Sequence, residues 1–407
     1  MEPKLQRQLE KNFAAPSDSL EPAKEPSLHP GTPPQTPREH TAFDRIFVGP
    51  NGLRAGWSIL LFYAIYYLLR VLVGTVFYAA GLIGETLDNS ASSILAAELV
   101  PFTSLLAAAA IMALLEGRRF SSYNLAGPRR ARRFATGAIA GFSALSLLVA
   151  ALVCGGWLHV AHGALSGAEA LRLAALWGCA FLVLASVEEG LFRCYALFTL
   201  ARGITFWWAL AAQAVICADA FIHSHRNGAW GVYLAAALGL VPCFILHRRG
   251  AALSSRARDE KSVVFPGLAV DQKSAARSAF WQAAWVTSTV FGLYHTMNNG
   301  ENWVGVFAAA AIGFVFCLSV RLTGSVWWAI GFHAAWDWSE TFFYGTADSG
   351  LQGQGHLLSS SPAGNPLWSG GADGPEGSLL VLGVILLLIL LLILVHGRKR
   401  GTASAAA

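Results

Sequence analysis

Residues 379–395 read LLVLGVILLLILLLILV and contain no polar side chain. A helix needs about 20 mainly apolar residues to cross the hydrocarbon core of a bilayer, so this run is nearly long enough. The whole chain has 407 residues, of which 55% are hydrophobic and only 13% are charged. Soluble domains usually carry about 25% charged residues. The composition therefore predicts a membrane protein.

Similar apolar segments recur along most of the chain. They lie at 56–83, 92–115, 134–157, 171–192, 204–222, 229–247, 280–297, 303–320, 324–343 and 379–396. Their lengths suit membrane-spanning helices, and they predict an all-α, polytopic transmembrane helical bundle of about ten spans.

Composition also divides the chain into parts. Residues 1–45 are rich in Pro, Ser, Glu and Lys, which is typical of a disordered tail. The predicted parts that follow are N-terminal transmembrane helices at 46–170, a core at 171–344, a Gly/Ser-rich loop at 345–377, and a final transmembrane helix with a basic tail at 378–407.

Charge bias predicts the orientation. Arginine clusters at 118–133 and 248–261, and the basic tail at 398–400, lie between or after apolar segments. The positive-inside rule places them in the cytoplasm and explains the net charge of +5 without a nucleic-acid partner. The loop at 345–377 then lies outside. An even number of spans places both termini, including the tail at 1–45, in the cytoplasm.

Two stretches resemble each other and predict a duplicated helical hairpin. Residues 206–250 and 280–324 share a Phe-Trp pair, then a histidine, Asn-Gly, Trp, Ala-Ala-Ala, Gly and Cys in the same order. Shared order over this length indicates duplication better than chance likeness does. Residues 206–279 are therefore interpreted as an inserted hairpin and linker.

A charged motif interrupts the span that begins at residue 171. A charged side chain costs about 2.5–3.5 kcal/mol at the centre of a membrane helix, so such groups pair, face a cavity or act. Glu189 and Arg193 are i,i+4 neighbours and can form an ion pair. Glu188 points about 100° away on a helix and is free for another role. Glu98, inside the second span, has no assigned role.

Each of two further motifs places a histidine and a second side chain on the same face of a helix. One is Phe291 with His295, and the other is His333 with Asp337, again at i,i+4 spacing. Helices in lipid satisfy polar groups against one another, so these faces are expected to meet at one interior site. Carboxylates and imidazoles can activate water directly, or can hold Zn²⁺ or another divalent metal. The spacing leaves both routes open.

Together these residues resemble the CaaX-protease and bacteriocin-processing (CPBP, or Abi) intramembrane peptidases. The pattern of that family is Glu-Glu-x-x-x-Arg, Phe-x-x-x-His and His-x-x-x-Asn/Asp on separate membrane helices. It matches Glu188-Glu189 with Arg193, Phe291 with His295, and His333 with Asp337. The resemblance covers residues 171–344 and implies that they form a peptidase core. The sequence around the third motif resembles that of bacterial members.

The resemblance implies an intramembrane endopeptidase that cleaves membrane-associated proteins, in a bacterial-type cytoplasmic (inner) membrane. Glu188 would activate water together with His295, while His333 and Asp337 would bind the oxyanion or a metal. The ion pair of the first motif would hold that motif in place. Family members are usually described as metallo-endopeptidases; the ligands would come from Glu188, His295, His333 and Asp337.

The chain departs from the family pattern in three ways. Asp337 stands where Asn is frequent, and an ionised Asp cannot donate to an oxyanion, which favours either metal binding or a raised pKa of Asp337. Cys194 stands where Gly is frequent. The duplicated hairpin also supplies His223 and His225 as a rival second motif. His295 is favoured, because its copy leads directly into the third motif.

Two other functions compete with proteolysis. A non-catalytic membrane scaffold or immunity-type protein could keep the same fold, and the rearranged hairpin favours it. A proton-coupled transporter also uses intramembrane Glu, His and Arg. An effect that survives loss of Glu188 would indicate the scaffold, and proton-coupled flux would indicate the transporter.

Overall fold

A computed structural model describes residues 47–49, 52–84, 88–163, 165–223, 228–259 and 266–404. The tail at 1–45 and His225 lie outside the described residues. In chain order the α-helices are α3 (Ala55–Ala79), α4 (Ala91–Leu115), α5 (Arg130–Cys154), α6 (Gly167–Glu189), α7 (Leu197–Leu200), α8 (Phe206–His223), α9 (Ala229–Asp259), α10 (Pro266–His295), α11 (Trp303–Thr323), α12 (Trp327–Trp338), α13 (Pro366–Ser369) and α14 (Leu380–Ser404).

Shorter elements join these helices. Two segments are π-helical, η2 (Gly190–Ala196) and η3 (Ser339–Tyr344), and two are 3₁₀ turns, η1 (Phe120–Ser122) and η4 (Pro375–Gly377). Strand β1 (Val48–Gly49) pairs with β2 (Gly52–Leu53), and β3 (Leu158–His162) pairs with β4 (Leu358–Pro362), both antiparallel. The all-α prediction thus holds for the spans but missed two small sheets.

Seven helices of the described chain are long and apolar enough to cross a membrane. They are Ala55–Ala79, Ala91–Leu115, Arg130–Cys154, Gly167–Leu200, Phe206–His223, Ala229–Gly250 and Trp303–Thr323. Large apolar side chains such as Leu68 and Val71 are exposed on α3, as expected for a surface that faces lipid. The chain is therefore a polytopic helical membrane protein.

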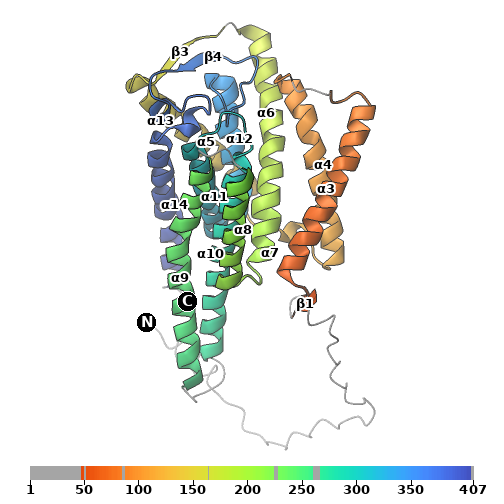
Figure 1. The fold of residues 1–407 in the computed structure, drawn as a ribbon, viewed down its shortest axis with the longest axis vertical. Helices are drawn as coiled ribbons and strands as arrows, with labels where there is room; N and C mark the ends of the chain where they lie inside the picture. Colours follow the sequence, from red (N-terminus) through yellow and green to blue (C-terminus); the bar gives the residue numbers. More distant parts are fainter. Residues whose placement is uncertain are drawn as a thin grey trace, which may run out of the picture. The chain divides into compact units, whose positions relative to one another are not determined.

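The helices pack around α6, which lies between the α3–α4 pair and the other helices (Figure 1). On one side α6 contacts α4, and on the other it contacts α12. Helix α12 packs most extensively against α5. Helices α8 to α11 form two adjacent hairpins, and α14 packs against α11 and α5. Residues far apart in sequence therefore meet around α6, α10 and α12.

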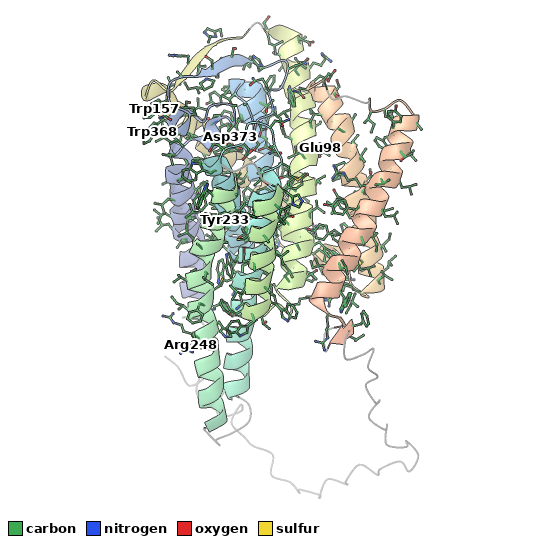
Figure 2. The ribbon with its side chains drawn as sticks, viewed as in Figure 1. Glu98, Trp157, Tyr233, Arg248, Trp368 and Asp373 are labelled. Carbon is green, nitrogen blue, oxygen red and sulfur yellow. The ribbon has the colours of Figure 1, made fainter. Side chains whose placement is uncertain are left out.

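The segment between η3 and α14 is an ordered cap. Its strand β4 pairs with β3, and Trp368 of α13 stacks on Trp157, with ring centroids 5.2 Å apart (Figure 2). The side chain of Asn365 caps α13 by accepting a hydrogen bond from the backbone of Leu367. These contacts hold the segment against the ends of the helices. The loop predicted at 345–377 thus has defined structure.

Candidate active site

A cavity of about 270 Å³ lies among α4, α6, α10, α11, α12 and the cap. Side chains from all three sequence motifs line it: Glu188, Phe291, His295, His333 and Asp337. Its remaining walls include Glu98, Phe181, Leu184, Tyr294, Phe316, Trp336, Asp348, Ser349 and Glu376. Polar groups from distant segments therefore share one hollow with aromatic and aliphatic walls.

The ion pair expected in the first motif is present and completely buried. Arg193 Nη1 lies 3.1 Å from Glu189 Oε1, and both side chains are 0% exposed. The guanidinium also lies over the ring of Phe291, 4.2 Å from its centroid, which adds a cation–π attraction. Gly313 of α11 makes room for it, because a side chain there would collide with Arg193. The first motif is thereby fixed to α10 and α11.

His333 links both glutamates of the first motif to the third motif. Its Nδ1 lies 3.2 Å from Glu189 Oε1. Its Nε2 lies 3.7 Å from Glu188 Oε2 and 3.6 Å from Asp337 Oδ2. A carboxylate can only accept, so the Nδ1–H of His333 donates to Glu189. The angle of about 100° between Glu188 and Glu189 on a helix predicted that they would face different partners. In the structure both carboxylates face His333.

Close helix packing places His333 at this point. A side chain at Gly141 of α5 would collide with the backbone of Phe332, and one at Gly331 of α12 would collide with the backbone of Phe134. Small residues allow membrane helices to approach closely, and these glycines let α12 pack closely against α5. The first motif continues into the π-helical segment η2, which contains Arg193, and the π-helical segment η3 follows the third motif. Such segments are frequent at functional sites.

His295 has a defined tautomer. It ends α10, and its Nδ1 lies 2.7 Å from the backbone oxygen of Phe291. Because a carbonyl oxygen can only accept, Nδ1 carries the proton and Nε2 keeps a free lone pair. The ring of Phe291 packs edge-on against His295, with centroids 4.7 Å apart. Phe291 therefore contacts both His295 and Arg193.

His223 of the rival second motif lies away from the cavity. His223 ends α8 and its Nδ1 lies 2.9 Å from Asp219 Oδ1, with the His223 side chain 70% exposed. It does not line the cavity that holds His295 and His333. The other candidate, His225, falls outside the described residues.

Sequence reasoning assigned no role to several polar residues that line the cavity. Glu98 reaches it from α4, beside α6 (Figure 2), and Trp336 reaches it from α12. Asp348 and Glu376 reach it from the cap. The unpaired intramembrane charge of Glu98 was a usable signal. No local pattern pointed to Asp348 and Glu376, because the cap carries neither a hydrophobic period nor a motif, whereas Trp336 lies within the third motif on α12.

The cap region buries several acids. Burial next to Asp373 raises the pKa of Glu301 to about 10. Burial also raises the pKa of Asp373 well above its usual value, although the backbone N–H of Asn302 donates to its carboxylate. Burial therefore favours the neutral form of both carboxyl groups. Asp373 lies where the cap meets α11 (Figure 2).

The donor set around His333 suits a divalent metal. Donors about 2.0–2.1 Å from a tetrahedral ion lie about 3.4 Å apart. His333 Nε2 lies 3.7 and 3.6 Å from oxygens of Glu188 and Asp337. A histidine that binds metal usually donates its other N–H to a carboxylate, as His333 does to Glu189. These donors suit a metal by their type and by their distances from His333, although the three do not all lie within 4.8 Å of one another, as the oxygens of Glu340, Asp348 and Glu376 do.

A comparison with known families supports the resemblance seen in the motifs. Residues 263–339 match the model of the Rce1-like family, type II CAAX prenyl endopeptidases. The match confirms the resemblance over that segment. It spans the Phe291–His295 and His333–Asp337 motifs, whereas Glu188 and His223 lie before it. Neither a curated protein nor a solved structure matches the chain.

Proposed function

We propose that this protein is an intramembrane endopeptidase that hydrolyses peptide bonds of membrane-associated proteins. The single observation that carries the proposal is that all three motifs line one cavity between membrane helices. The match to a membrane endopeptidase family over 263–339 supports it. A cavity lined by polar groups within a bundle of apolar helices would let a hydrolytic reaction take place beside lipid.

Glu188 and His295 are proposed to activate the attacking water. Both line the cavity, and His295 Nε2 has a free lone pair because Nδ1 donates to the backbone. A carboxylate and a neutral imidazole can each accept a proton from water. The proton would then pass to the leaving amine. Glu98 lines the same cavity and is a candidate to orient that water.

His333 and Asp337 are proposed to stabilise the oxyanion of the tetrahedral intermediate. His333 Nε2 faces the carboxylates of both Glu188 and Asp337. This arrangement requires a positive charge among them, either a proton on Nε2 or a metal ion. Glu189 fixes the orientation of His333, and Arg193 fixes Glu189. The oxyanion would meet a preorganised positive group.

In an alternative, metal-dependent route, Glu188, His295, His333 and Asp337, which line the same cavity, would instead hold Zn²⁺. The ion would polarise the scissile carbonyl and lower the pKa of a bound water. We expect purified protein to carry about one Zn²⁺ per chain, and His333→Ala to lose it, as measured by mass spectrometry of metals. His223→Ala is the control and should keep the ion. Active wild-type protein without stoichiometric metal would favour the metal-free route.

His295, and not His223, is proposed as the functional second-motif histidine. His295 lines the cavity and lies within the family match, whereas His223 is exposed in an ion pair with Asp219. We expect His295→Ala to lower cleavage by at least about 10²-fold, the usual range for loss of a general base. His223→Ala should retain wild-type turnover. The reverse pattern in purified protein would assign the role to the first hairpin.

We also propose the topology that the charge pattern predicts. The C-terminal half of α10, the helix α12 with η3, and the apolar Leu380–His396 would add to the seven spans and give ten. Hairpins α8–α9 and α10–α11 would be copies of one unit. The protein would lie in a bacterial-type inner membrane with both termini in the cytoplasm and the cap outside.

The proposed function can be tested without knowing the substrate. Cells that express wild-type protein are compared with cells that express Glu188→Gln, and new protein termini are identified by mass spectrometry. Termini that arise only with the wild type, in or beside membrane segments, are the expected result. Identical termini in the two samples, with both proteins present at equal levels, would overturn the proposal. A biological effect unchanged by Glu188→Gln would then indicate the scaffold function.

A further inference from the structure

Three carboxylates outside the sequence motifs meet at the wall of the cavity. Glu340 comes from η3, Asp348 from the cap, and Glu376 from η4. One oxygen of each lies within 4.8 Å of the others, and Asp348 and Glu376 also line the cavity. The chain thus brings three negative groups together from separate segments.

Glu340 makes this cluster more than a group of acidic side chains. Its side chain is completely buried, yet neither carboxylate oxygen accepts a hydrogen bond within the described residues. Among those residues, none of the three acids forms an ion pair with Lys, Arg or His. A buried ionised carboxylate without a partner is very costly, so these acids must either hold a proton or bind a cation.

Neighbouring donors orient the other two carboxylates. Trp336 Nε1–H donates to one oxygen of Glu376 at 2.6 Å, and the hydroxyl of Ser349 donates to the other at 2.7 Å. The hydroxyl of Thr341 donates to Asp348 at 3.1 Å. Such bonds use one lone pair of each oxygen and leave the other available. Hydrogen-bonded carboxylates of this kind are typical of metal sites.

We propose that Glu340, Asp348 and Glu376 bind a Ca²⁺ ion, at a site distinct from the one around His333. The ligands are all oxygens, which favours a hard cation over Zn²⁺. They come from three segments with irregular geometry, which Ca²⁺ accepts and the strictly octahedral Mg²⁺ does not. The ion would join the cap to the end of α12 and complete one wall of the cavity. The inference does not depend on the proposed proteolytic activity.

Binding can be measured on the full-length protein in detergent after treatment with EGTA. Calorimetric titration with CaCl₂ should give one Ca²⁺ per chain, and saturating Ca²⁺ should raise Tm by a few degrees, because the ion binds the folded state. Glu340→Gln should weaken Ca²⁺ binding at least tenfold and abolish the rise in Tm. In EGTA this variant should be at least as stable as the wild type, since it removes a buried charge.

Two control variants separate the possible outcomes. Glu301→Gln alters a buried acid nearby that lies outside the cluster, and it should bind Ca²⁺ as the wild type does. Glu188→Gln should also bind Ca²⁺, which keeps this site separate from catalysis. Absence of binding by the wild type, equal binding by Glu340→Gln, or a response to Zn²⁺ or Mg²⁺ but not to Ca²⁺ would each overturn the proposal.

Discussion

Glu188→Gln is expected to lower peptide cleavage by at least about 10³-fold while membrane insertion and Tm stay at wild-type values. General acid–base catalysis contributes about 10²–10⁴-fold, and an amide can neither accept the proton of water nor bind a metal as strongly as a carboxylate. Glu188 faces the cavity and His333 Nε2, so its charge lies where the reaction is proposed to occur. Gln keeps the size of the side chain and the packing of α6.

The measurement is initial-rate kinetics with purified protein and a cleaved peptide identified from the termini found in cells. Glu169→Gln is a matched control on the same helix, because Glu169 forms only an exposed pair with Arg172. That variant should cleave at the wild-type rate. Wild-type turnover by Glu188→Gln would show that the water is activated by another group.

Arg193→Met is expected to destabilise the protein by about 3–5 kcal/mol, the usual cost of breaking a buried pair and leaving one charge alone. Arg193 and Glu189 are both fully buried, and the guanidinium also contacts the ring of Phe291. Its loss leaves the carboxylate of Glu189 in the bundle with only His333 as a partner. The variant should accumulate poorly and melt at lower temperature in detergent.

A double variant separates stability from activity. Replacing both Glu189 and Arg193 by Met removes the two charges together, and buried ion pairs can often be replaced by apolar residues without loss of stability. We expect Tm to recover but cleavage to stay low, because His333 Nδ1 loses its acceptor. Arg172→Met, which breaks an exposed pair, should leave Tm at the wild-type value. Arg193→Met with wild-type Tm would contradict the role given to this pair.

The candidate site was partly accessible from sequence because its motifs are local. The i,i+4 spacing of Glu189 and Arg193 predicted their ion pair, and the same spacing placed His333 and Asp337 on one face. The high cost of charge in lipid predicted that the motifs would meet. Helical angles alone did not predict that Glu188 and Glu189 both face His333, because that depends on how α12 approaches α6.

The sequence by itself determined that the chain crosses a membrane as helices, since apolar runs such as 379–395 leave the backbone no other partner than itself. Only the tertiary structure decided which distant side chains share a cavity. Glu340, Asp348 and Glu376 have no common spacing or motif, and their meeting depends on how the cap folds back over the helices. Local spacing fixes neighbours within one helix, whereas contacts between segments are set by packing of the whole bundle.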